Sequence, residues 1–202
     1  MITDNMPNKP LYKYALFLIV LLSVVLGGYH YYDQNFSSIS INPNRPLQWR
    51  DFKMVKVINN RPSINARCIT YITPTIKNVQ QNDGFAKIIT DLDVGIDEDL
   101  TQVSGSFMSR ADPATKQVVL NHENGHFKIA QIIGHRILNQ AENHRFHPTA
   151  YQEQFDSLVR AQFIAWREMD RQYDLETTSP RDPVKQGEWD LFFKSELKKK
   201  DR

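Results

Sequence analysis

Residues 119–137 read VLNHENGHFKIAQIIGHRI, a helical hydrophobic pattern that contains two histidines in the spacing H-E-x-x-H. Upstream, Asp112 and Pro113 supply a helix N-cap and a proline at the first helical position, so we expect a helix from 112 to about 141. The residues on the apolar side of this helix include both histidines of the motif. They are Val119, His122, His126, Ala130, Ile133 and Ile137. The two imidazoles therefore point along the buried face.

The spacing of the two histidines has a mechanical reason. His122 and His126 lie one helical turn apart on one face, so both rings can bind the same metal ion. Glu123 is turned about 100° away from His122 and is placed to reach a water rather than the metal. The motif predicts Zn²⁺ at His122 and His126, with Glu123 as the general base of a hydrolase. The alternative is a pair of histidines held by ordinary hydrogen bonds in the core.

A catalytic zinc usually has three protein ligands and one open position. His135 lies on the far side of the helix from His122, so we expect it at the surface rather than at the metal. The helix that follows offers carboxylates near its end: Asp170, Asp174 and Glu176. We predict Asp174 and Glu176 as candidate metal ligands, and any of the three carboxylates could instead hold a ligand histidine in place.

Charge and cysteine content exclude other classes of function. The net charge is +2, with basic residues scattered along the chain, so no nucleic-acid-binding surface is indicated. Cys68 is the one cysteine, which rules out an intrachain disulfide and a cysteine-rich zinc knuckle. Because it sits in a β-rich stretch, we interpret it as a small core residue.

The N-terminal region predicts attachment to a membrane. Residues 14–32 are almost wholly apolar and follow Lys9 and Lys13, which favours a single-pass transmembrane helix with residues 1–13 in the cytoplasm. The rest of the chain would then lie outside the cytoplasm, in the periplasm or beyond the cell. A cleaved signal peptide, which would make the protein secreted, is the alternative. Residues 33–46 are rich in Ser, Asn and Pro and are predicted to be a linker to a domain spanning 47–202.

The order of patterns within 47–202 indicates an α+β domain. We expect a small sheet in the first half and three helices in the second. The predicted strands are 67–73, which would end at Pro74, then 86–96 and 101–108; the predicted helices are 112–141, 148–173 and 182–199. The strand at 101–108 could offer an edge with which a peptide pairs.

Several segments together resemble the bacterial domain-of-unknown-function 922 family, described as zinc-dependent proteases. They are Leu47-x-Trp49-x-Asp51-Phe52, Leu120-x-His122-Glu123-x-x-His126-Phe127, Tyr173-Asp174-x-Glu176-Thr177 and Gln186-x-x-Trp189. The resemblance implies a zincin-like domain. The family pattern continues after the threonine with x-His-Gly, where this chain has Ser179 and Pro180. If that histidine is a ligand in relatives, Asp174 or Glu176 would have to replace it, or a water would complete a weaker site.

The leading hypothesis is a membrane-anchored zinc metallopeptidase that cleaves peptide or protein substrates outside the cytoplasm. Tyr173 would stabilise the oxyanion, or would serve as a core residue. Two alternatives stay open: a catalytically inactive zinc-binding or interaction domain of the cell envelope, and a metal-dependent hydrolase of another bond, such as a cell-wall amide.

Overall fold

The structure is a computed structural model that describes the chain except for residues 1–17, 20, 31–34, 62, 179–181 and 199–202. The chain divides into two compact units, Met1–Phe36 and Ser37–Arg202. In the first unit, residues 18–19 and 21–30 are helical. Within the described residues, none of the helices combines the length and apolar character needed to cross a membrane. Parts of the predicted anchor at 14–32 and the whole predicted tail at 1–13 lie outside those residues.

The main sheet of the second unit has three strands in the order β1-β5-β4. β4 (Thr70–Asn82) and β5 (Phe85–Ile96) form a long antiparallel hairpin, and β1 (Ser38–Asn42) pairs with β5 in parallel. Apolar residues of β5 recur on one face, so this face is buried while Asp91 and Asp93 lie on the other. The sequence therefore gives the sheet one face for the core and one for solvent.

Two boundaries predicted from the sequence need correction here. The linker predicted at 33–46 contains β1, which is hydrogen-bonded to β5 from Ser38 to Asn42, so the domain begins near Ser37 rather than at Leu47. Pro74 does not end its strand, because β4 is an edge strand and a proline there leaves no ladder hydrogen bond unmade.

A second sheet has the order β2-β6-β3, with β2 at Lys53–Val55, β3 at Ala66–Arg67 and β6 at Gln102–Ser104. It lies beside a one-turn helix, η1 (Trp49–Asp51), and a short helix, α2 (Gly105–Arg110). The strand predicted at 101–108 is thus only partly correct, since its second half is α2. Its proposed role as a free edge is wrong, because β6 is paired on both sides.

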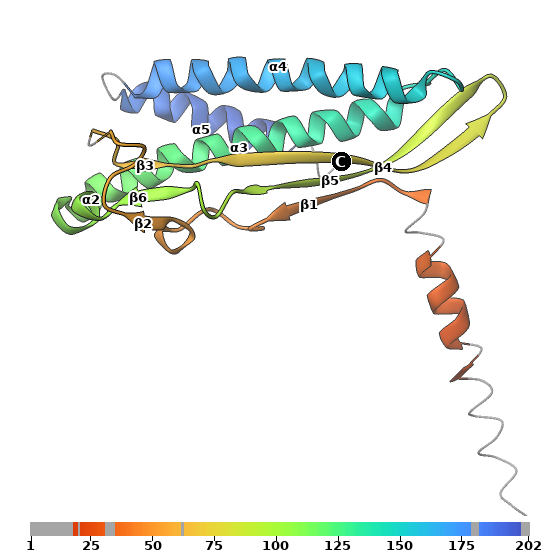
Figure 1. Ribbon diagram of the computed structural model, residues 1–202, viewed down its shortest axis with the longest axis horizontal. Helices are drawn as coiled ribbons and strands as arrows, with labels where there is room; N and C mark the ends of the chain where they lie inside the picture. Colours follow the sequence, from red (N-terminus) through yellow and green to blue (C-terminus); the bar gives the residue numbers. More distant parts are fainter. Residues whose placement is uncertain (1–17, 20, 31–34, 62, 179–181, 199–202) are drawn as a thin grey trace, which may run out of the picture. The chain divides into compact units, whose positions relative to one another are not determined.

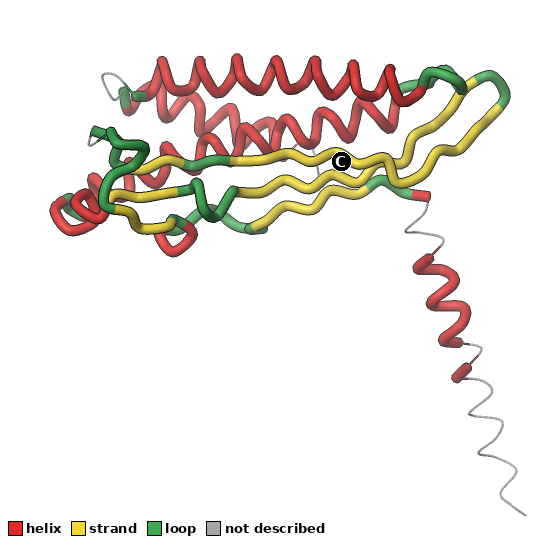
Figure 2. Tube along the Cα trace, in the orientation of Figure 1, coloured by secondary structure: helices red, strands yellow, loops and turns green. Residues whose placement is uncertain are grey.

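Three helices complete the domain, as expected: α3 (Pro113–Asn143), α4 (Tyr151–Thr177) and α5 (Pro183–Lys198). The predicted N-cap of α3 is confirmed, since Asp112 accepts a hydrogen bond from the Thr115 amide at 2.9 Å. Figure 1 shows α3 lying between the main sheet and the pair α4–α5, and Figure 2 shows the strands and helices in separate layers. The α+β class predicted from the sequence is confirmed.

Two hydrophobic clusters meet along α3. The larger packs α3, α4 and α5 on the main sheet, and the smaller joins α3 to the second sheet, η1 and α2. Ile129, Ile133 and Ile137 belong to the first cluster, whereas Val119 and Phe127 belong to the second. The H-E-x-x-H segment therefore spans the boundary between the clusters, on a helix that is held from both sides.

Candidate metal centre

The candidate site lies where the N-terminal half of α3 packs against the C-terminal half of α4. His122, Glu123 and His126 come from α3. α4 contributes Asp170, Tyr173, Asp174 and Thr177, which are spaced i, i+3, i+4 and i+7 and so share one helical face. That face of α4 is polar in an otherwise apolar interface, which marks it as the partner of the two histidines.

Three potential ligand atoms converge on one point. His122 Nε2 and His126 Nε2 are 3.3 Å apart, and Asp174 Oδ1 lies 3.3 Å from each of them. Tetrahedral zinc with bonds of about 2.0–2.1 Å holds its ligand atoms about 3.3 Å apart. The triangle therefore matches one face of a zinc tetrahedron. Asp174 was one of the two predicted third ligands, and its side chain is 52% exposed, whereas the His122 and His126 side chains are 15% and 12% exposed.

The tautomer of His126 is set by Asp170. His126 Nδ1 lies 2.7 Å from Asp170 Oδ1. Because an ionised carboxylate can only accept, the ring donates its Nδ1–H to Asp170, and in a neutral ring Nε2 keeps its lone pair. Asp170 thus fixes the orientation of the His126 ring, as the second of the two roles predicted for it requires.

The tautomer of His122 is set by Thr177, a residue of the quoted family segment to which the sequence analysis gave no role at the site. The Thr177 hydroxyl donates to the Tyr173 carbonyl oxygen at 2.6 Å and so has no second proton to give. Its oxygen lies 3.1 Å from His122 Nδ1, so it accepts the Nδ1–H of that ring. His122 Nε2 is therefore also left with a lone pair. Thr177 lies three residues after Asp174 and seven after Asp170, and this helical spacing was the signal that could have identified it.

Two lone pairs and a carboxylate oxygen at these distances repel each other unless a positive charge lies among them. In the metal-free chain a proton meets this need. Burial lowers the pKa of His126, but the hydrogen bonds to Asp170 and Asp174 outweigh burial and raise that pKa to about 10. A divalent cation bound by the three atoms would replace that proton. The donor set of two imidazoles and one carboxylate is one that zinc accepts in catalytic sites.

Glu123 is buried beside the triangle rather than directed into solvent, with 5% of its surface exposed. Its Oε2 accepts a hydrogen bond from the Cys68 amide at 2.7 Å, which fixes the carboxylate against the chain that joins β3 to β4. Burial raises the pKa of Glu123, and the interactions of its carboxylate with the two imidazoles and with the Cys68 amide only partly offset this. A carboxylate with a raised pKa next to two imidazoles that could bind a metal is suited to accept and return a proton.

Tyr173 holds the two histidines rather than facing a substrate. Its ring stacks on the ring of His122 with 4.9 Å between the centroids, and it meets the ring of His126 edge-on with 5.2 Å between the centroids. No part of Tyr173 is exposed. Its hydroxyl lies 3.0 Å from the His122 carbonyl oxygen and 3.1 Å from Gln186 Oε1, both of which can only accept. Burial raises the pKa of Tyr173, so the hydroxyl keeps its proton. The predicted role in stabilising an oxyanion is therefore corrected to the alternative, a core residue.

The glycine inside the motif makes this packing possible. A Cβ on Gly125 would lie 2.1 Å from the hydroxyl oxygen of Tyr173, well inside contact distance. Glycine costs about 1 kcal/mol relative to alanine within a helix, and close approach of the tyrosine explains why it is present.

We expect Gly125→Ala to lower the free energy of unfolding by about 1–3 kcal/mol, because Tyr173 is enclosed on all sides and must be displaced. Thermal or denaturant unfolding would measure this. Gly187→Ala is the matched control: it lies within α5 with open space around its Cβ position, so it should be neutral or stabilise by up to about 1 kcal/mol. Equal behaviour of the two variants would contradict the proposed packing.

Glu176, the other predicted third ligand, is not part of the cluster. Its two carboxylate oxygens accept hydrogen bonds from Gln172 at 2.8 Å and from the indole of Trp189 at 2.8 Å. It is two residues beyond Asp174 on α4, so a turn of about 200° carries it to another face of the helix. The prediction of Glu176 as a ligand is therefore wrong.

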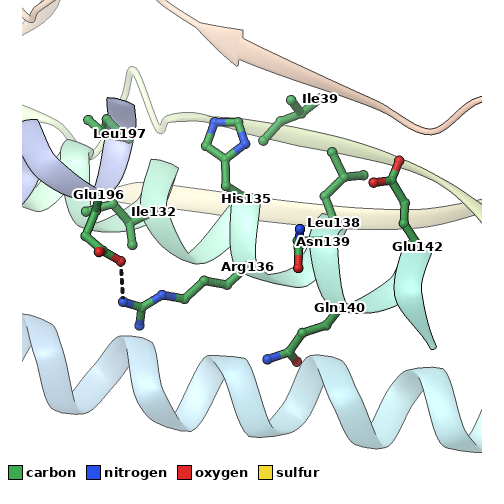
Figure 3. A pocket seen from close by; sticks show the side chains of 10 residues that line it. All are labelled: Ile39, Ile132, His135, Arg136, Leu138, Asn139, Gln140, Glu142, Glu196 and Leu197. Carbon is green, nitrogen blue, oxygen red and sulfur yellow. Dashed lines mark hydrogen bonds and ion pairs between the residues drawn. The ribbon is translucent and has the colours of Figure 1, made fainter. Parts of the chain in front are cut away.

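His135 lies more than two turns beyond His126 on α3, in a separate pocket between α3, β1 and the end of α5. Figure 3 shows its ring directed towards Ile39, while Arg136 reaches Glu196 at 2.9 Å. The sequence predicted a surface position for His135, but the residue is half-buried in this pocket. Its exclusion from the metal site holds.

The flanking segments quoted above also converge on the site. Asn124, within the motif, accepts a hydrogen bond from the Leu47 amide at 2.7 Å and donates to the Leu47 carbonyl oxygen at 3.2 Å. At the other end, Gln186 lies against the Tyr173 hydroxyl. These contacts tie the chain before η1 to α3, and the start of α5 to the tyrosine of α4 that packs on both histidines.

Comparison with known families bears on this same region. Residues 111–181 match the model of a family described as a bacterial protein of unknown function, DUF922. Residues 111–181 are thus similar to the DUF922 family. The matched segment contains α3, α4 and every residue of the histidine–aspartate cluster, and the resemblance predicted from the sequence is confirmed. No curated protein and no solved structure matched the chain. Ser179 and Pro180, the two positions at which the chain departs from the resemblance described above, lie outside the described residues.

Proposed function

We propose that this protein is a zinc-dependent hydrolase that cleaves peptide bonds, with His122, His126 and Asp174 as zinc ligands. The observation that carries the proposal is the triangle of ligand atoms with 3.3 Å edges, in which Thr177 and Asp170 have fixed both imidazole tautomers. A histidine pair with a purely structural role has no need for both lone pairs to face a carboxylate.

Bound zinc would act as a Lewis acid that activates a water and polarises the substrate carbonyl. Glu123 takes one proton from the attacking water as the water oxygen bonds to the carbonyl carbon. The same carboxyl group then returns that proton to the nitrogen as the carbon–nitrogen bond breaks, so a free carboxylic acid and an amine leave. The Cys68 amide holds Glu123 in place during both transfers.

The buried carboxylate also favours a catalytic role over an inactive zinc-binding domain. Burial makes the charged form of Glu123 costly, and three other side chains already supply the ligand atoms. A domain that only bound zinc would gain nothing from this cost.

The direct test is to purify the full chain, measure bound zinc by elemental analysis, and assay hydrolysis of casein and of a mixed peptide library. We expect one zinc per chain and hydrolysis that a chelator abolishes and added zinc restores. A zinc-loaded chain that leaves every peptide intact would overturn the proposed function.

The two residues behind the ligands should tune metal affinity. We expect Asp170→Ala and Thr177→Val each to weaken zinc binding about 10- to 100-fold, because each frees a ring to adopt the wrong tautomer or orientation. Competition with a chromogenic chelator would measure this. Thr115→Val on the first turn of α3 is a matched control, since its hydroxyl bonds only to the N-cap Asp112. Zinc affinity that stays at the wild-type value in both Asp170→Ala and Thr177→Val, as it should in the control, would contradict the tautomer assignment.

We also propose that residues 14–32 anchor the chain in a membrane with the domain outside the cytoplasm. The support is the apolar composition of this segment and the lysines at 9 and 13 that precede it. Alkaline phosphatase fused after Arg202 and produced in bacteria should be active, since that enzyme requires a compartment outside the cytoplasm. An inactive but intact fusion would show the opposite orientation.

A further inference from the structure

The chain that joins β3 to β4 holds Glu123, and it lies at a gap between the two sheets. β3 ends at Arg67 in the second sheet, and β4 begins at Thr70 in the main sheet. Cys68 and Ile69 lie between them, outside the residue pairs of both ladders. Because buried backbone groups need hydrogen-bond partners, side chains have to supply what a neighbouring strand does not.

A buried threonine supplies partners for Ile69. The Thr101 hydroxyl accepts a hydrogen bond from the Ile69 amide at 3.1 Å and donates to the Ile69 carbonyl oxygen at 3.2 Å. That oxygen also accepts from the Asp97 amide at 2.8 Å. No part of Thr101 is exposed. One side chain thus pairs with both backbone groups of Ile69, as the next strand of a sheet would.

Glu123 contacts the same segment from its opposite edge. In an extended chain, the N–H and C=O of one residue point to one edge and those of the next residue point to the other. Ile69 accordingly meets Thr101, whereas the Cys68 amide donates to Glu123 Oε2 at 2.7 Å. The position of Ile69 therefore sets how the Cys68 amide meets the carboxylate.

The backbone of Thr101 is itself held on both sides. Its amide donates to the Asp97 carbonyl oxygen at 2.8 Å, and its carbonyl oxygen accepts from the Lys53 amide of β2 at 2.9 Å. The turn before it is closed by Asp97 Oδ1, which accepts from the amides of Asp99 and Leu100 at 3.0 and 2.9 Å. The hydroxyl thus projects from a fixed point between the two sheets.

We infer that Thr101 is a positioning residue for Glu123 and acts through the backbone of Cys68 and Ile69. The inference rests on the proposed hydrolase function and adds a residue that keeps the general base in place. Without the hydroxyl, the segment between the sheets can shift, and a misplacement of about 1 Å in a reacting group costs about 100-fold in rate.

The first test separates catalysis from metal binding. Thr101→Val removes the hydroxyl with little change in shape, and we expect kcat for a fluorogenic peptide to fall about 10-fold with KM and zinc content unchanged. Thr101→Ser keeps the hydroxyl and should stay within about 2-fold of the wild type. Thr90→Val is the matched control, because Thr90 is equally buried but its hydroxyl has no hydrogen-bond partner among the described residues. Its kcat should equal that of the wild type.

The second test observes the hydrogen bond without any activity. Cys68 is the one cysteine in the sequence, so the metal-free full chain produced with nitrogen-labelled cysteine gives a single labelled amide in its NMR spectrum. A carboxylate acceptor shifts this amide proton downfield, and Glu123→Gln marks its position with a neutral acceptor. Thr101→Val should move the resonance upfield, whereas Thr101→Ser and Thr90→Val should leave it in place.

If valine prevents folding, Thr101→Ser and Thr101→Ala replace it, since both lack the methyl group and differ only in the hydroxyl. A Cys68 resonance or a kcat that stays at the wild-type value in the folded variant without the hydroxyl would overturn the inference. If the wild-type chain cleaves no peptide, the proposed function fails, while the Cys68 resonance still decides whether Thr101 holds Glu123.

Discussion

Glu123→Gln should lower peptide hydrolysis about 100- to 10,000-fold and leave zinc binding intact. Glutamine has nearly the same shape and can accept the hydrogen bond that the Cys68 amide donates, so the site should stay assembled. What is lost is the ability to take a proton from water and return it to the leaving amine. Initial rates on a fluorogenic peptide, together with zinc content per chain, would measure both halves of the prediction.

The same substitution should not lower the free energy of unfolding of the metal-free chain at neutral pH. Because burial raises the pKa of Glu123 in the folded chain, its contribution favours folding at low pH and is lost as pH rises through the folded pKa. At neutral pH the metal-free Gln variant should therefore be at least as stable as the wild type. Glu142→Gln, on the exposed end of the same helix, is the control that should alter neither activity nor stability. A Glu123→Gln protein that lost zinc or unfolded would show Glu123 to be structural.

The sequence predicted the parts of the site that depend on a single helix. The positions of His122, Glu123 and His126 follow from 3.6-residue periodicity, and the Asp112 cap follows from local chemistry. Which carboxylate joins the two histidines depends on how α4 is rotated against α3, and no single-helix pattern contains that information. Asp174 and Glu176 were therefore equal candidates until packing turned one towards the histidines and the other towards Trp189.

The errors in the fold have a similar origin. Local composition made 33–46 a linker, yet β1 is defined by parallel pairing with β5, about 50 residues away in the sequence. Pro74 predicted a strand end, but its place at the edge of the sheet was decided by strand order. The helices α4 and α5 were predicted close to their observed bounds, because the amphipathic stripe of α4 and the Asp182-Pro183 start of α5 are encoded locally.

Asp174→Ala should weaken zinc binding at least about 100-fold, more than Asp170→Ala or Thr177→Val, because it removes one of the three proposed ligand atoms. The Asp174 side chain is half-exposed, so its loss should leave the metal-free fold intact. Chelator competition would give the affinity, and the rise in melting temperature on adding zinc would confirm it, since a ligand that binds only the folded chain stabilises it.

Glu176→Ala is the decisive comparison, because it removes an equal charge two residues away on the same helix. It should leave zinc affinity unchanged and cost only the hydrogen bonds to Gln172 and Trp189. The two variants thus separate direct coordination from a general loss of negative charge near the site. Should Asp174→Ala bind zinc as tightly as the wild type, the triangle of ligand atoms would not be the metal site, and the hydrolase proposal would lose its foundation.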